Sequence, residues 1–148
     1  MGPATVVPPA PFELFSHEAD VGVRGRGATL AEAFAQAGRA LTAVTVDPDL
    51  VAETESLAIS CAADDPELLL FEWLNALVFE TSTRDLVFAR HEVEIDPQAR
   101  RLEARVHGEP VDVGRHRPAV EVKGATMTGL RVYREPDGTW VTECVVDV

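Results

Sequence analysis

The sequence predicts an α+β fold in which a mostly antiparallel sheet packs against two helices. The observation behind this is that two helical patterns in the first half are followed by a run of strand patterns joined by short turns. Pro136-Asp137-Gly138 supplies the turn of a predicted hairpin between two of these strands. With 148 residues, the chain suits one compact domain at residues 12–148, preceded by a flexible N-terminal tail at residues 1–11.

The first predicted helix begins after Thr29. Thr29 and Glu32 form a capping box, in which each side chain accepts a hydrogen bond from the backbone near the other. Apolar residues then recur at helical spacing as far as Val44. The helix is expected to end before Asp47-Pro48, because a residue that precedes proline avoids the helical region.

The second predicted helix has Asp65 as its N-cap and proline at its first position. Its body is apolar on most sides, apart from a narrow stripe that contains Glu72 and Asn75. Such a helix is expected to lie buried between layers, with Trp73 in the core.

The strands are predicted from alternating apolar residues and from the turn residues between them. Gly25-Arg26-Gly27 is expected to make a tight turn from strand to helix. The predicted strands are Phe12–Ser16, Val21–Gly25, Ser56–Ala62, Leu86–Ile95, Leu102–Gly108, Val120–Gly124, Leu130–Arg134 and Thr139–Asp147.

The charge balance limits the classes of partner. Thirteen basic residues stand against 25 acidic ones, a net charge of −12, which disfavours direct RNA binding and favours a basic protein surface or cations. No apolar run has the length of a membrane helix, and the first residues lack the features of an export signal. We therefore expect a cytoplasmic protein that does not contact membranes, with Cys61 and Cys144 as reduced thiols.

Common catalytic signatures do not occur. The sequence has neither a G-x-S-x-G elbow nor a phosphate-binding loop, and its histidines lack zinc-ligand spacing. His91, His107 and His116 are expected on exposed edges, solvated or locally hydrogen-bonded.

Three other positions are candidates for function. Asp20 stands at the start of an apolar strand, where a carboxylate needs hydrogen bonds or a cation, although it could also be a turn residue. Asp147 and the carboxylate of Val148 lie close together and would repel each other without a cation, unless the end of the chain is frayed and solvated. Lys123 faces away from Val122 and is either functional or an exposed strand-edge lysine.

The chain contains four motifs that resemble those of the archease family, in the same order along the chain, and the candidate positions fall within three of them. The motifs are FELFSHEADVG at residues 12–22, LFEWLN at residues 70–75, VEVKGAT at residues 120–126 and VVDV at residues 145–148. The resemblance implies a compact α+β fold and the function of a non-catalytic accessory protein to an RtcB-type, GTP-dependent RNA ligase. Archeases promote guanylylation and repeated turnover of that ligase in tRNA splicing and RNA repair, and they contact RNA only indirectly.

The resemblance also implies a site. Asp20, Asp147 and Val148 would bind a divalent cation (Ca²⁺, Mg²⁺ or Mn²⁺), Val148 through main-chain or terminal oxygens. Lys123 would act with both aspartates in activating the ligase, and His17 and Glu18 are secondary candidates. Clustered carboxylates suit an oxygen-rich cation site of this kind.

The chain departs from the family pattern at two places. Glu18 replaces a threonine of the opening box, and Met127-Thr128 replace a tyrosine and a histidine after Thr126. The first change adds a carboxylate near Asp20, and the second removes two polar side chains near Lys123.

Two other functions remain as alternatives. A general chaperone-like interaction module would act without metal, and a small metal-dependent hydrolase would use the same carboxylates for its own turnover. We expect a monomer in each case.

Overall fold

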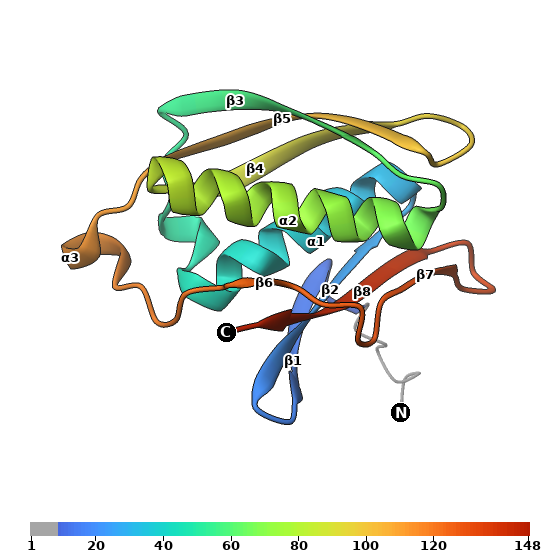
Figure 1. The fold of residues 1–148 in the computed structure, drawn as a ribbon, viewed down its shortest axis with the longest axis horizontal. Helices are drawn as coiled ribbons and strands as arrows, with labels where there is room; N and C mark the ends of the chain where they lie inside the picture. The colour runs from blue at the N-terminus through green and yellow to red at the C-terminus, as the bar shows by residue number, and fades with distance from the viewer. Residues whose placement is uncertain (1–8) are drawn as a thin grey trace, which may run out of the picture.

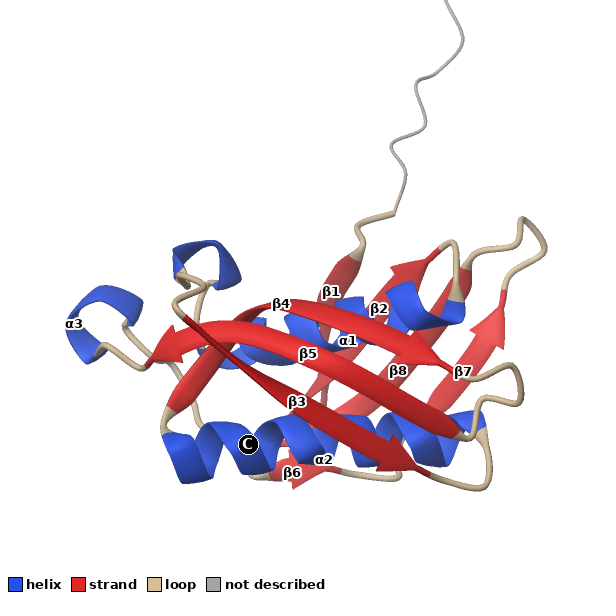
Figure 2. Cartoon of the chain, turned by 90° about the horizontal axis from the view of Figure 1, so that it is seen from above, coloured by secondary structure: helices blue, strands red, loops and turns tan. Residues whose placement is uncertain are grey.

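Two long helices, α1 (Leu30–Thr45) and α2 (Pro66–Arg84), lie between two antiparallel sheets (Figure 1). The computed structural model describes residues 9–148. Most of the tail predicted at residues 1–11 therefore lies outside the described residues. Figure 2 shows the strands of the smaller sheet crossing over the helices, with the strands of the larger sheet beyond them. The prediction of an α+β fold with antiparallel strands is confirmed, whereas the division into two sheets was not predicted.

The larger sheet has the strand order β1-β2-β8-β6, and β7 also pairs with β8. The smaller sheet has the order β3-β5-β4. The strand bounds are β1 (Phe12–His17), β2 (Asp20–Gly27), β3 (Glu55–Ala62), β4 (Leu86–Ile95), β5 (Arg101–Pro110), β6 (Gly124–Ala125), β7 (Arg131–Arg134) and β8 (Trp140–Asp147). A 3-10 turn, η1 (Pro48–Leu50), and a one-turn helix, α3 (Val113–His116), complete the fold.

Both helices begin where the sequence predicts, and α1 ends at Thr45, before Asp47-Pro48 as expected. The Thr29 hydroxyl accepts a hydrogen bond from the Glu32 amide at 3.1 Å, and the Glu32 carboxylate accepts one from the Ala28 amide. Asp65 caps α2 by accepting a hydrogen bond from the Leu68 amide at 2.9 Å. These bonds satisfy amides that a helix leaves free at its start.

The core lies around α2, and the prediction that this helix is buried between layers is confirmed. Trp73 is fully buried, and its indole N–H donates to the Phe34 carbonyl of α1 at 2.9 Å. Among the large apolar side chains of α2, Phe79 is the exception, with 61% of its surface exposed. Among residues 9–148, no helix has both the length and the apolar character needed to cross a membrane.

Gly25 and Gly27 do not form the predicted turn, because both belong to β2. A Cβ atom on Gly25 would lie 2.4 Å from the Ala33 carbonyl oxygen of α1, and one on Gly27 would lie 2.6 Å from the Ala33 nitrogen. The glycines therefore let β2 approach the backbone of α1 closely. This brings the larger sheet directly against the helix layer.

Two of the histidines predicted on exposed edges are buried instead. His91 packs edge-on against Trp73, with the ring centroids 6.0 Å apart. Desolvation, together with the charges of Arg39 and His107, lowers the pKa of His91 to about 3. His116 is also buried, but it is locally hydrogen-bonded as expected, since its Nε2 lies 3.0 Å from the Glu109 carboxylate. His107 is half-buried.

The strand predicted at Val120–Gly124 is wrong for most of its length, because only Gly124–Ala125 forms ladder pairs. Pro118 cannot donate a ladder hydrogen bond, and the segment after it runs across a cavity between the helices. Val122 nevertheless packs against the core while Glu121 and Lys123 are exposed, as the alternation predicts.

Candidate metal and partner site

The register of the larger sheet brings the two candidate aspartates together. Strands β2 and β8 are antiparallel and pair Val21 with Val146. One further step along this register sets Asp20 opposite Asp147. Residues directly opposite in an antiparallel pair have Cβ atoms about 4.5–5.5 Å apart. Two segments at opposite ends of the sequence therefore meet at one edge of the fold.

Both aspartates lie on the outward face of the sheet. Val21 and Val146 pack into the core beneath the helices, and alternation turns the residues next to them outward. His17 pairs with Asp20 across the β1–β2 hairpin and belongs to the same outward set. We call His17, Asp20 and Asp147, with Val148 and Lys123 beside them, the acidic tip.

The neighbouring part of this face is built differently. Glu143 is buried, and its carboxylate accepts hydrogen bonds from Arg24 at 2.8 Å and from the Tyr133 hydroxyl at 3.2 Å. Arg24 also binds Glu13, and this hydrogen bond lowers the pKa of Glu13 below its ordinary value. Arg131 approaches Glu143 to 3.7 Å. The carboxylates in the middle of the face are thus paired with basic side chains.

The acidic tip has no such pairing. Within residues 9–148, neither Asp20 nor Asp147 forms an ion pair with a lysine, arginine or histidine. Like charges directly opposite in a sheet destabilise the pair. A cation between the two carboxylates would remove this repulsion.

Lys123 lies beside the end of β8. Its backbone amide donates to the Asp147 carbonyl oxygen at 2.8 Å, while its side chain is exposed. Strand β6, which follows Lys123, is held by α2, because the Asn75 side chain accepts a hydrogen bond from the Ala125 amide at 2.9 Å. Asn75 is a positioning residue for β6, whereas the sequence analysis identified it only as part of a polar stripe. A polar side chain in an otherwise apolar helix was the signal.

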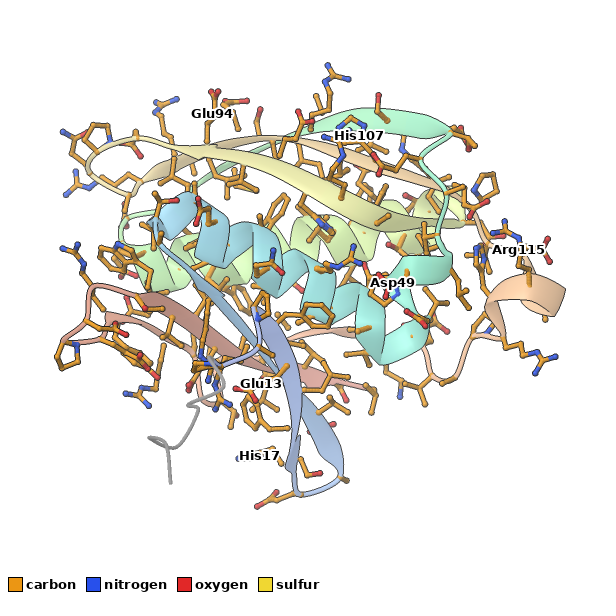
Figure 3. The ribbon with its side chains drawn as sticks, turned by 180° about the vertical axis from the view of Figure 1, so that it is seen from behind. Glu13, His17, Asp49, Glu94, His107 and Arg115 are labelled. Carbon is orange, nitrogen blue, oxygen red and sulfur yellow. The ribbon has the colours of Figure 1, made fainter. Side chains whose placement is uncertain are left out.

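Glu18 occupies the two-residue turn between β1 and β2. Its φ angle is 54°, a left-handed conformation that an ordinary side chain adopts at a cost. The side chain is exposed and lies at the same end of the hairpin as His17, which Figure 3 places at the far end of the hairpin from the helices. Glu18 thus adds negative charge near the acidic tip.

The second departure from the family pattern, Met127-Thr128, does not disturb the backbone hydrogen bonds between this segment and β8. The Thr126 amide and hydroxyl both donate to the Val145 carbonyl oxygen, at 3.0 and 2.8 Å. Val145 in turn donates to the Thr128 carbonyl oxygen at 3.1 Å. Met127 is more than half exposed, so its side chain does not displace the segment that precedes β7.

The tip offers oxygen donors that suit a hard cation, but its side chains do not form a complete site. In the described part of the chain, no group of three or more histidine, cysteine, aspartate or glutamate side chains could hold a metal ion. Asp20 and Asp147 supply two carboxylates. Any further ligands would be oxygens of Val148, water or groups of a partner protein.

The layered arrangement and the tip define the class: a small α+β protein whose two antiparallel sheets enclose a pair of helices, with carboxylates that lack a basic partner in the described chain where β2 begins and β8 ends. A model of the Archease protein family (MTH1598/TM1083) matches residues 12–148. The chain belongs to the archease family.

Individual relatives agree with this assignment. The chain is 34% identical to protein archease from Pyrococcus abyssi and 36% identical to that from Thermococcus gammatolerans, over 93% of this chain and 98% of each relative. It is also 30% identical to protein archease-like from Drosophila melanogaster, over 90% of this chain and 87% of the relative.

Solved structures share the fold. The solution structure of protein 1598 from Methanobacterium thermoautotrophicum superimposes with a TM-score of 0.81 at 29% identity, covering 93% of this chain and 99% of that one. The crystal structure of an archease from Thermotoga maritima, described as a possible chaperone, gives a TM-score of 0.58 at 15% identity over 98% of this chain and 99% of that one. The second likeness concerns the fold alone.

Proposed function

We propose that this protein is a non-catalytic activator of an RtcB-type, GTP-dependent RNA ligase in tRNA splicing and RNA repair. In this proposal it promotes guanylylation of the ligase and its repeated turnover, and it acts as a monomer in the cytoplasm. The observation that supports the proposal is that Asp20 and Asp147, which lack a basic partner in the described chain, directly adjoin the Val21–Val146 pair of β2 and β8. The choice of an RtcB-type RNA ligase as the partner rests on membership of the archease family.

The proposed mechanism uses an incomplete cation site. Asp20, Asp147 and an oxygen of Val148 would bind a divalent cation (Ca²⁺, Mg²⁺ or Mn²⁺), and groups of the ligase would complete its coordination. Such a shared ion would help to place or exchange the metals of the ligase during guanylylation. Lys123, exposed beside Asp147, would contact negatively charged groups in the ligase active site.

The charge of the protein supports docking on a protein and not on RNA. A net charge of −12 repels a phosphate backbone and attracts the basic surface of an RNA-binding enzyme. RNA would therefore be contacted only through the ligase.

The direct test is a single-turnover guanylylation assay with purified ligase. We expect Asp20→Ala and Asp147→Ala each to reduce stimulation by at least about tenfold, because removing groups around a metal typically weakens its binding by 10- to 100-fold. Glu94→Ala is the matched control, since Glu94 is an exposed carboxylate on the opposite side of the molecule (Figure 3). Full stimulation by both aspartate variants would refute the proposal.

A C-terminal extension tests the role of Val148 separately. Residues added after Val148 move the terminal carboxylate away from the tip but leave the side chains of Asp20 and Asp147 unchanged. Reduced stimulation is expected if the free carboxylate is a ligand. Unchanged stimulation would show that the free carboxylate is not needed as a ligand.

The description of the Thermotoga relative as a possible chaperone favours a second candidate, a chaperone-like interaction module without a metal role. The two candidates differ in their response to chelation. Calorimetric titration with Ca²⁺, Mg²⁺ and Mn²⁺, combined with guanylylation measured at a fixed free Mg²⁺ sufficient for the ligase, separates them. Stimulation that is independent of any cation bound by this protein would favour the chaperone-like function.

A further inference from the structure

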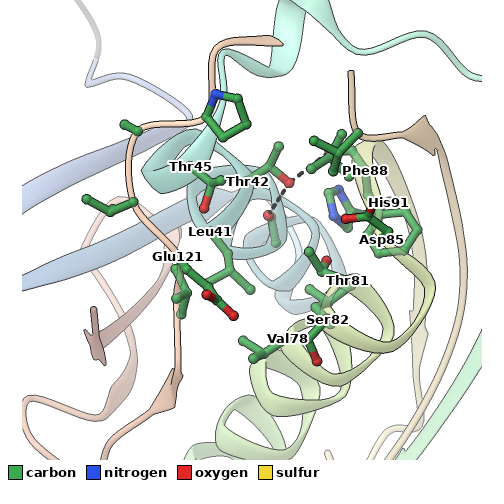
Figure 4. A pocket seen from close by; sticks show the side chains of 18 residues that line it. Leu41, Thr42, Thr45, Val78, Thr81, Ser82, Asp85, Phe88, His91 and Glu121 are labelled. Carbon is green, nitrogen blue, oxygen red and sulfur yellow. Dashed lines mark hydrogen bonds between the residues drawn. The ribbon is translucent and has the colours of Figure 1, made fainter. Parts of the chain in front are cut away.

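A cavity of about 400 Å³ lies between α1, α2, β4 and the segment 118–122 (Figure 4). This volume falls within the range of about 300–1,000 Å³ that is usual for small-molecule sites. None of the five residues of the acidic tip lines the cavity. It is therefore a separate site, and the inference drawn from it does not rest on the proposed function.

The inner walls of the cavity are apolar. Leu41 of α1, Leu77 of α2 and Phe88 of β4 are buried there, and Val78 and Val122 are half-buried on either side. The outer residues, including Asp85, Val120 and Glu121, are exposed. The cavity therefore has an apolar interior and opens to solvent.

His91 is the one ionisable side chain of the inner wall. It is buried, and its Nε2 has no hydrogen-bond partner among the described residues. A Cβ atom on Gly38 would lie 2.7 Å from the imidazole ring, so a glycine at this position of α1 leaves room for it. Because burial lowers the pKa of His91 to about 3, the ring is uncharged at neutral pH and would not repel a cation.

The charged side chains that line the cavity are acidic, and the charge of Arg39, which acts on His91, comes from outside the lining. Among residues 9–148, the carboxylates of Asp85 and Glu121 are the only charged side chains that line it, and no lysine or arginine does so. The C-terminal turns of both α1 and α2 also line it, through residues such as Thr45 and Ser82. The C-terminus of a helix carries a partial negative charge that favours cations.

We propose that this cavity binds a small organic cation: an amine that carries a compact apolar group. The apolar group would occupy the interior beside Leu41, Leu77 and Val78. The ammonium group would lie toward the mouth, where the carboxylates of Asp85 and Glu121 and the two helix ends favour positive charge. The same charges exclude nucleotides and other phosphate-bearing ligands.

The test uses three probes of nearly equal size that differ in charge: 2-phenylethylamine, 2-phenylethanol and phenylacetate. Each is titrated into the full ¹⁵N-labelled protein at pH 7, and the amide resonances are followed by NMR. We expect saturable shifts of residues in the cavity walls, with the amine bound about fivefold more tightly than the alcohol, as one modest charge interaction allows. Phenylacetate should give no saturation.

Two kinds of variant locate the binding. Asp85→Asn with Glu121→Gln should abolish the preference for the amine over the alcohol while leaving the apolar interior intact. Asparagine suits position 85, because its φ angle is 55° and asparagine tolerates this region. Asp64→Asn is the matched control, since Asp64 is an exposed carboxylate that does not line the cavity, and it should leave the preference unchanged.

Val78→Trp fills the cavity from its half-buried side and should abolish binding of all three probes. If its amide spectrum shows that the variant is not folded, Thr81→Phe at the same wall replaces it. The proposal is overturned if no probe gives saturable shifts in the cavity walls, if the alcohol or phenylacetate binds as tightly as the amine, or if folded filling variants bind as the wild type does.

Discussion

Glu143 and Asp147 belong to the same strand and face the same side of the larger sheet, yet their surroundings differ. Glu143 is buried and interacts with Arg24, Tyr133 and Arg131. Asp147 is exposed, and within the described chain it has no basic partner. A protein that needed only stability would gain from pairing both carboxylates. The middle of this face is held together by ion pairs and hydrogen bonds, and the unpaired tip is where our proposal places an external cation or partner.

The largest expected effect concerns the helix layer that supports both regions. Trp73→Ala should lower the free energy of unfolding by about 3–5 kcal/mol, because it leaves a cavity where a fully buried aromatic side chain was. Urea unfolding measures this loss. Phe79→Ala on the same helix is the control, since Phe79 is 61% exposed and should change stability by no more than about 0.5 kcal/mol. Equal losses would mean that α2 is not enclosed as described.

The next largest effect is stabilisation by a divalent cation, which is expected at the acidic tip and not elsewhere on this face. A divalent cation at about 100 times its Kd should raise the free energy of unfolding by about 2.7 kcal/mol, because only the folded chain brings Asp20 and Asp147 together. Thermal unfolding with and without Ca²⁺ measures the gain. Asp147→Asn should abolish it and Glu94→Gln should retain it. An equal gain in the Asp147 variant would place the ion elsewhere.

Removing the paired carboxylate of Glu143 should reduce the stability of the protein but not its stimulation of the ligase. Glu143→Ala should cost about 1–3 kcal/mol, since it leaves the Arg24 Nε–H and the Tyr133 hydroxyl without an acceptor in a partly buried place, although Arg24 keeps its bond to Glu13. Denaturant unfolding gives this value. The folded fraction of the variant should still stimulate the ligase normally. A loss of stimulation larger than the loss of folded protein would show that the two regions are not separate.

In the absence of divalent cations, neutralising the tip should help the fold slightly. Asp20→Asn should raise the free energy of unfolding by about 0.2–1 kcal/mol, because it removes repulsion between charges directly opposite in the sheet. The measurement is urea unfolding in chelator at low salt. A destabilised variant would mean that Asp20 already has a favourable partner within the chain.

The smallest effect is the response to acid. The hydrogen bond from Arg24 holds the pKa of Glu13 below its ordinary value of 4.5. Its contribution to stability is therefore present above pH 4.5 and is lost as the pH falls through the lowered value. Glu13→Gln should make unfolding less dependent on pH in that window, by no more than tenths of a kcal/mol at this partly exposed position. If the variant unfolds with the same pH dependence as the wild type, the ion pair of Glu13 with Arg24 does not contribute to stability.

Much of the fold follows from local signals in the sequence. Thr29 and Asp65 cap their helices as predicted, and the Pro136-Asp137-Gly138 turn joins β7 to β8. The division into two sheets could not be predicted, because pairing partners depend on contacts between distant segments and not on alternation within one strand. His91 was misassigned for the same reason: its charged neighbours in sequence face solvent, while its own side chain turns toward Trp73.

The site was predictable only in part. The sequence and the family motifs point to Asp20, Asp147 and Lys123, and in the structure the two aspartates adjoin the Val21–Val146 pair with Lys123 beside Asp147. The support from Asn75 and the cavity beside His91 were not predicted. Each depends on which helix face packs against which strand, and a single sequence does not contain that information in a local pattern.

The pairing of β2 with β8 also has a consequence for how the molecule assembles. Arg24 and Glu143, which bond across this pair, are 119 positions apart in the sequence. Contacts of such long range form slowly, because much of the chain must lose entropy before they are made. Until β8 arrives, β2 presents an open edge that could recruit strands from other copies. The β2 edge is therefore open to self-association until β8 pairs with it.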